Sequence, residues 1–139
     1  MIILDTNVLS AIMRPVPELA VARWMDRQSQ DSIWITTVTV MEILAGLEQM
    51  SAGRRRRELE NAFHKLLDDL IHGQVAPFDI SAAEHSGRLM ARRILKGLSV
   101  ESRDIMIAGI AEALGATLAT RNLPHFADLT VAVVSPWEE

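Results

Sequence analysis

Three carboxylates stand where they could act together on one substrate. Asp5 directly follows the short apolar run of residues 2–4, Glu42 comes soon after a second such run, and Asp104 lies near the start of an apolar helix. Carboxylate oxygens bind Mg²⁺ or Mn²⁺, and such an ion can activate a water molecule and stabilise the charge that develops on a phosphodiester. The chain has no cysteine, which excludes thiolate metal sites and cysteine nucleophiles. Oxygen-based metal chemistry is therefore the first hypothesis.

The segments around these residues alternate between two periods. Short apolar runs predict strands over residues 2–4, 32–36, 75–78, 117–120 and 130–134. Apolar residues at helical spacing predict helices directly after residues 5–7 and over residues 18–30, 39–51, 54–71, 81–96 and 102–114. Strands that alternate with helices are typical of an α/β fold, here with a mainly parallel sheet of four to five strands covered on both faces.

This topology places the acidic residues on one edge of the sheet. Right-handed crossovers put every strand-to-helix junction at the carboxyl edge, where open α/β folds bind their ligands. Asp5 ends the first strand, Glu42 lies in the first turn of the helix after the second, and Asp104 begins the helix before the fourth. Asn122 follows the end of that fourth strand. We therefore expect these four oxygen-bearing side chains to converge.

Each carboxylate also has a purely structural explanation. Thr39 and Glu42 have the spacing of a capping box, and Asp5 could be an N-cap. Ser102 could cap a helix whose positive end Asp104 favours. Taken together, however, three carboxylates at one partly buried edge would repel and raise one another's pKa values unless a cation neutralised them. A divalent ion with oxygen ligands, Mg²⁺ or Mn²⁺ rather than zinc, resolves that conflict.

Composition places the chain among ordinary globular proteins. Its 139 residues are 49% hydrophobic and 23% charged, which predicts a single domain over residues 1–139. The net charge of −4 argues against a whole surface that binds phosphate backbones, so any nucleic-acid contact must be local. Asp5 interrupts any signal peptide, and the apolar run 105–116 contains Glu112 and is too short to span a bilayer. We expect a cytoplasmic protein without a membrane segment.

Four segments of the chain resemble the motifs of a known family, in order and over the whole length. The segments are Met1–Ser10, Thr36–Ile43 with Gly46, Asp104–Ala108, and Ala119–Asn122 with His125–Phe126 and Pro136–Trp137. They resemble PIN-domain ribonucleases, in particular the VapC toxins of toxin–antitoxin pairs and their FitB-like branch. Four motifs in order, at fitting separations, make this resemblance specific.

The resemblance implies a three-layer α/β/α PIN-like fold and a prokaryotic, metal-dependent endoribonuclease that acts as a toxin. In such an enzyme Asp5, Glu42 and Asp104 bind Mg²⁺, or Mn²⁺ in its place, and position the attacking water. The resemblance also implies a small VapB- or FitA-like antitoxin, which inserts a segment into the active-site groove. It further implies a homodimer.

Asn122 departs from the family pattern, because many relatives carry a fourth acidic residue there or a few positions on. This departure favours a site with three carboxylates, with Asp128 as an alternative fourth acid. Thr6 and Thr120 stand beside the expected ligands, where a hydroxyl could hydrogen-bond a carboxylate or a metal-bound water, or cap a helix. We predict an auxiliary role for these two hydroxyls.

A run of four arginines is the one dense basic segment. The run consists of Arg54, Arg55, Arg56 and Arg57. It starts a predicted helix, where the positive end of the macrodipole opposes it and a counter-charge is needed. RNA phosphates could supply that charge, through contacts that release counterions. Glu58 and Glu60, or an acidic antitoxin, could supply it as well, so RNA binding is one of three open interpretations.

Three other functions compete with a metal-dependent ribonuclease. A catalytically weak or inactive PIN-like module would bind its partner without turnover, and Asn122 is the feature that favours it. A phosphatase of the haloacid-dehalogenase type would use Asp5 as a nucleophile, but Asn7 stands where its second acid is needed. A DNA-binding antitoxin is disfavoured because no helix-turn-helix or basic stripe is evident. Metal-dependent cleavage of RNA would separate the enzyme from the binding module.

Overall fold

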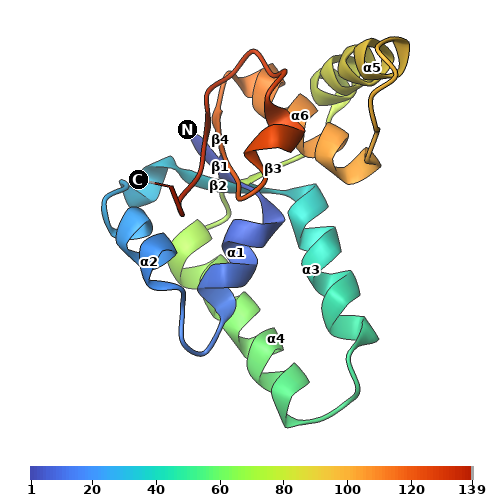
Figure 1. Cartoon of the computed structure of the whole chain (residues 1–139). Helices are drawn as coiled ribbons and strands as arrows, with labels where there is room; N and C mark the ends of the chain where they lie inside the picture. Colours follow the sequence, from blue (N-terminus) through green and yellow to red (C-terminus); the bar gives the residue numbers. More distant parts are fainter. Residues whose placement is uncertain (139) are drawn as a thin grey trace.

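Five parallel strands form the centre of the molecule. The computed structural model describes residues 1–138, and within them the strands are β1 (Ile2–Leu4), β2 (Ile33–Thr36), β3 (Val75–Ala76), β4 (Thr117–Ala119) and β5 (Val133–Val134). They join in the order β3-β2-β1-β4-β5, and each neighbouring pair is parallel. The prediction of an α/β fold with a mainly parallel sheet of four to five strands is confirmed (Figure 1).

Helices cover both faces of this sheet. The helices are α1 (Thr6–Met13), α2 (Leu19–Asp26), α3 (Thr37–Gln49), α4 (Arg54–Leu66), α5 (Ile80–Leu95) and α6 (Ser102–Leu114). Shorter turns are η1 (Gln30–Ser32), the π-helical turn η2 (Leu67–Ile71) and η3 (Leu123–Phe126). In Figure 1, α1, α2 and α4 lie on one side of the sheet, and α5 and α6 lie on the other. None of the helices formed by residues 1–138 has the length and apolar character needed to cross a membrane.

Side chains alternate between the two faces along each strand, because successive residues of a strand point in opposite directions. Leu4 packs with α1, α2 and α4 in one buried cluster, whereas Ile3 packs with α5 and α6 in the other. On β4, Ala119 belongs to the same cluster as Leu4, and Leu118 belongs to the same cluster as Ile3. The molecule therefore has three layers, with a hydrophobic core on each side of the sheet.

Two helices start upstream of the predicted caps, because other oxygen-bearing side chains satisfy the first N–H groups. α3 starts two residues earlier than predicted, since Thr36 Oγ1 accepts a hydrogen bond from the N–H of Thr39 at 3.1 Å. α5 is capped by Asp79 and not by Ser81, and Asp79 Oδ1 accepts the bond from the helix at 2.9 Å. The predicted helices exist, but their first residues were predicted wrongly.

Three predicted elements are shorter in the structure. α2 ends at residue 26 instead of 30, because the N–H of Arg27 bonds back to two carbonyls and closes the last turn. β5 covers Val133–Val134 and not residues 130–134, since its backbone bonds to β4 begin only at the carbonyl of Ala132. β3 stops at Ala76, before Pro77, which has no N–H to donate to a sheet.

A glycine lets α6 approach α5 closely. A Cβ at Gly109 would lie 1.8 Å from Ser86 Oγ and 2.6 Å from the backbone carbonyl oxygen of Ala82, so a side chain there would force the helices apart. Ser86 Oγ in turn donates a hydrogen bond to the carbonyl of Ile105 at 2.8 Å. These contacts fix α6, whose first turn carries Asp104, against α5. Gly115, in the left-handed region at φ 61°, ends α6 and returns the chain to β4.

Candidate active site

One open pocket at the carboxyl edge of the sheet collects the predicted oxygen-bearing residues. The pocket has a volume of about 370 Å³, and its lining includes Asp5, Glu42, Asp104 and Asn122. Thr6 lines it as well, and Thr120 contacts Asp5 from the end of β4. We call this the carboxylate pocket. Parallel strands and the helices that flank them thus bring together residues that are more than a hundred positions apart.

Asp5 is the buried carboxylate of this pocket, with 5% of its surface exposed. Its Oδ1 accepts a hydrogen bond from the N–H of Thr6 at 2.8 Å, and its Oδ2 accepts one from Thr120 Oγ1 at 2.7 Å. Burial raises the pKa of the Asp5 carboxyl to about 6 in spite of these hydrogen bonds, and repulsion from Asp104 and Glu42 adds to the rise. The ionised form of Asp5 is therefore destabilised, and a bound cation would relieve it.

Glu42 faces the pocket from α3. Its Oε1 accepts a hydrogen bond from Thr6 Oγ1 at 2.9 Å, and Thr6 Oγ1 also lies 3.0 Å from Thr39 Oγ1. Arg103 Nη1 lies 3.7 Å from Glu42 Oε2. The capping-box explanation of Glu42 is wrong, because Thr36 caps α3 and Thr39 lies inside it. The carboxylate is free of the helix backbone and available to a ligand.

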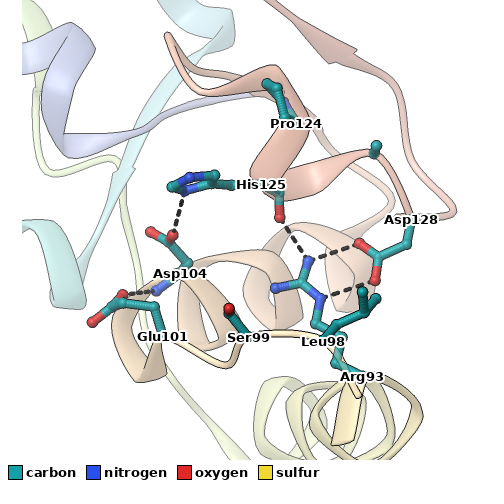
Figure 2. Close-up of a pocket in the computed structure, with 9 residues that line it drawn as sticks. Arg93, Leu98, Ser99, Glu101, Asp104, Pro124, His125 and Asp128 are labelled. Carbon is teal, nitrogen blue, oxygen red and sulfur yellow. Dashed lines mark hydrogen bonds and ion pairs between the residues drawn. The ribbon is translucent and has the colours of Figure 1, made fainter. Parts of the chain in front are cut away.

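Asp104 lies between the carboxylate pocket and a second pocket, of about 370 Å³, which Figure 2 shows. The N–H of Asp104 donates to Glu101 Oε2 at 2.9 Å, so Glu101 is the cap of α6 and the proposed Ser102 cap is wrong. The side chain of Asp104 is left for other partners. His125 Nδ1 lies 3.1 Å from its Oδ2, as Figure 2 shows.

The second pocket holds Asp128, the alternative fourth acid. Arg93 contacts both carboxylate oxygens of Asp128, through Nε at 2.9 Å and Nη2 at 2.7 Å, and also donates to the carbonyl of His125 at 2.7 Å (Figure 2). We call this the Arg93 pocket. Asn122, by contrast, lines the carboxylate pocket, and its N–H donates to Thr120 Oγ1 at 3.0 Å. The prediction that Asp128 could replace the missing fourth acid is therefore wrong, because Arg93 binds its carboxylate in the Arg93 pocket, outside the carboxylate pocket.

The arginine run lies apart from the carboxylate pocket. In Figure 1 the start of α4 lies beside the end of α3, away from the sheet. Arg54 pairs with Glu58 at 2.9 Å, and Arg56 pairs with Glu60 at 2.7 Å and with Glu48 at 2.9 Å. Acids of the chain itself thus supply counter-charge to two of the four arginines. RNA binding by Arg54, Arg55, Arg56 and Arg57 stays a prediction.

The carboxylate pocket also contains residues that the sequence did not single out as site residues. Arg14, Glu18, Arg121 and Trp137 line it. Arg121 lies with its guanidinium 4.9 Å from the centre of the Trp137 ring. One signal was available, because Arg121 directly precedes Asn122 in a motif already singled out. No periodicity, however, links Arg121 to Glu18, which lies near the other end of the sequence.

The donor chemistry of the pocket fits Mg²⁺ or Mn²⁺. In the described part of the chain, no three His, Cys, Asp or Glu side chains lie close enough together to enclose a metal ion. Mg²⁺ does not require such a cage, since it binds through one or two carboxylates and keeps several waters. The pocket supplies oxygen donors only, and Asp5 is a buried carboxylate whose raised pKa shows the charge to be poorly compensated. The residues therefore fit a hard divalent cation.

Comparison with known proteins gives a consistent result. The PIN domain family model matches residues 2–129. Plasmid stability protein StbB of Pseudomonas syringae pv. tomato is 37% identical over 138 residues, and the VapC ribonuclease Y4jK of Sinorhizobium fredii is 35% identical over 138 residues, with 99% of both chains covered in each case. Toxin FitB of Neisseria gonorrhoeae is 30% identical over 139 residues, which cover the whole of both chains.

A solved structure shares the whole fold. The crystal structure of FitAcB from Neisseria gonorrhoeae superposes with a TM-score of 0.85 at 30% identity, and the match covers 100% of both chains. The family model and these relatives are a PIN domain and proteins of the VapC and FitB kind, and neither a phosphatase nor a DNA-binding antitoxin is among them. This chain belongs to the PIN-domain family, in the group that contains the VapC and FitB toxins.

Proposed function

We propose that this protein is a metal-dependent endoribonuclease that hydrolyses phosphodiester bonds of RNA. One observation carries the proposal: three carboxylates line one open pocket, and the pKa of the buried one, Asp5, is raised to about 6. Such a site needs a cation, and a divalent ion bound to carboxylates is what phosphodiester hydrolysis uses. Membership of the PIN family and the relative named a VapC ribonuclease support the choice of RNA.

Asp5, Glu42 and Asp104 would hold Mg²⁺, or Mn²⁺ in its place, one or two of them directly and the rest through the waters that the ion keeps. The ion would supply an activated water and stabilise the charge that develops on the phosphate. Thr120 and Thr6 act as positioning residues, because their hydroxyls donate to Asp5 at 2.7 Å and to Glu42 at 2.9 Å and so fix which carboxylate oxygens face the pocket. Asn122, which also lines the pocket, would offer a neutral amide oxygen in place of the charge of a fourth carboxylate.

We further propose that the protein is the toxin of a toxin–antitoxin pair. A VapB- or FitA-like antitoxin would inhibit it by inserting a segment into the carboxylate pocket. The relative named toxin FitB and the structure of FitAcB support this assignment. A homodimer is part of the same proposal.

Cleavage of a mixed pool of structured RNA tests the enzyme directly. Wild type, Asp5→Asn and Asp68→Asn are prepared identically and assayed with Mg²⁺, with Mn²⁺ and with EDTA. Asp68 is an exposed acid outside the carboxylate pocket, so it is the matched control for the same chemical change. We expect cleavage by wild type and Asp68→Asn that requires metal and is lost in Asp5→Asn. Equal cleavage by all three proteins would reveal a contaminating nuclease.

A PIN-like binding module is the second candidate, and Asn122 favours it. Such a module would bind RNA or the antitoxin in the same pocket without turnover. Restoring an acid with Asn122→Asp distinguishes the two functions. Wild-type cleavage that is metal-dependent supports the enzyme, whereas cleavage that appears only in Asn122→Asp identifies a module that lost its activity with this residue.

A further inference from the structure

Two arginines line the carboxylate pocket together with the acids, and a carboxylate of the same chain, Glu18, contacts both of them. Glu18 Oε1 lies 3.0 Å from Arg14 Nη1 and 3.8 Å from Arg121 Nη1. Its Oε2 accepts a hydrogen bond from Trp137 Nε1. We call Arg14, Arg121 and Trp137 the anion cradle. Two guanidinium groups and an indole N–H therefore converge on one carboxylate.

Glu18 occupies the cradle instead of capping its own helix. It stands at the N-cap position of α2, yet its side chain accepts no hydrogen bond from the first turn of that helix. An acid at this position would ordinarily gain from the N–H groups of the helix start. The carboxylate of Glu18 is thus bound by the cradle and not by the start of its own helix.

Arg121 is held at a fixed place relative to the acids. Its N–H donates to Asn7 Oδ1 at 3.2 Å, and its guanidinium lies 4.9 Å from the centre of the Trp137 ring. The preceding residue, Thr120, donates directly to Asp5. More than half of the Arg121 side chain is still exposed, so it can meet a ligand in the pocket. Hydrogen bonds through Asn7 and Thr120 therefore tie the backbone of Arg121 to the start of α1, next to Asp5.

We infer that the anion cradle is a subsite for a backbone phosphate of RNA next to the cleaved bond, and that Glu18 fills it in the RNA-free protein. This inference rests on the proposed ribonuclease function. Three carboxylates repel a polyanion, so a substrate that enters this pocket needs a cationic contact inside it, and guanidinium groups bind phosphate oxygens well. Binding of RNA would displace the Glu18 carboxylate, which makes Glu18 a built-in competitor.

Two substitutions with opposite effects test the inference. The probe is a fluorescein-labelled single-stranded RNA of mixed sequence, and its binding is followed by fluorescence anisotropy in EDTA over a range of salt concentrations. We expect Arg121→Gln to weaken binding about fivefold, the size of an exposed charge contact, and Glu18→Gln to tighten it by a similar factor. The slope of log K against log salt should fall by about 0.7 in Arg121→Gln, the change for one phosphate contact on a single strand.

Matched variants separate charge from folding. Arg88→Gln removes an arginine from the surface of α5, outside the pocket, and should leave affinity and slope unchanged. Arg121→Lys keeps the charge and should restore most of the slope. Under Mg²⁺, Arg121→Gln should raise KM with little change in kcat, as expected for a group that binds substrate and transition state equally well.

Equal RNA affinity and salt slope in wild type and Arg121→Gln would overturn the inference. So would a loss of affinity in Glu18→Gln, because the cluster would then be a structural support. Failure of the ribonuclease proposal is distinguishable: RNA binding that depends on Arg121, in a wild-type protein that cleaves nothing with metal, would support the cradle and reject the enzyme.

Discussion

Two aspartates in the two pockets that share Asp104 meet opposite electrostatic conditions. Asp128, in the Arg93 pocket, has both carboxylate oxygens on the guanidinium of Arg93, whose hydrogen bonds lower the pKa of Asp128. Asp5, in the carboxylate pocket, is almost fully buried, and its neighbouring acids are Asp104 and Glu42. Burial raises its pKa to about 6. Asp128 is paired with a cation of its own chain, whereas the charged groups that act on Asp5 within residues 1–138 are acids.

This difference separates a structural ion pair from a ligand site. Arg93 is 8% exposed at its side chain and also donates to the carbonyl of His125, so it joins α5 to the segment after β4. A buried charge that is paired and hydrogen-bonded in this way fixes the fold locally. A buried carboxylate without such a partner lowers the stability of the metal-free protein. Such a carboxylate is typical of a functional site, where a ligand supplies the missing positive charge.

The largest change in stability is expected from breaking the Arg93 pair. Arg93→Met leaves Asp128 and the carbonyl of His125 without their donor, and removing one partner of a buried pair is costly. Because Asp128 is 32% exposed and water can reach it, we expect a loss of about 2 kcal/mol. Urea denaturation measures it, with Arg88→Met on the exposed surface as the control. A loss no larger than that of the control would mean that the pair has no structural role.

Asp5→Asn should have the opposite sign. The Asp5 carboxyl binds its proton more tightly in the folded chain than in the unfolded one, so its contribution to stability is present below the ordinary pKa of 3.8 and is lost as the pH rises through about 6. The difference corresponds to roughly 3 kcal/mol. An amide lacks one of the two acceptors, which subtracts about 1 kcal/mol. We therefore expect a net gain of about 1–2 kcal/mol above pH 6 in EDTA.

Urea denaturation of wild type and Asp5→Asn at acidic and neutral pH checks this gain, which should shrink below pH 6. Asp68→Asn should show no such pH dependence. If Asp5→Asn is the less stable protein at every pH, the hydrogen bonds from Thr6 and Thr120 outweigh the buried charge, and the contrast with Asp128 is lost.

A smaller gain is expected from Asp104→Asn. Asp104 adds to the rise of the Asp5 pKa through charge repulsion, which is a weaker cause than burial. Removing its charge should raise the apo protein's stability by about 0.5 kcal/mol, seen as a slightly higher melting temperature in EDTA. A clear fall would assign Asp104 a structural role through its contact with His125.

The sequence predicted the carboxylate pocket because the pocket depends on topology. Once residues 2–4 and 117–120 are strands of one parallel sheet, Asp5 and Asn122 must lie at the same edge. Caps were predicted less well, since Thr36, Asp79 and Glu101 compete with nearby hydroxyls and only local geometry selects them. The anion cradle was missed because the Glu18–Trp137 contact spans 119 positions and depends on side-chain packing that no periodicity encodes.

The pKa of the Asp5 carboxyl, measured by NMR at its carboxyl carbon with and without Mg²⁺, tests most directly whether the Asp5 carboxylate binds a metal ion. We expect a pKa of about 6 in EDTA, which falls toward or below 3.8 when Mg²⁺ is added, while the carboxyl of Asp128 titrates below its ordinary range in both conditions. An Asp5 pKa near 3.8 in EDTA, or one that Mg²⁺ does not change, would contradict a metal site built on Asp5.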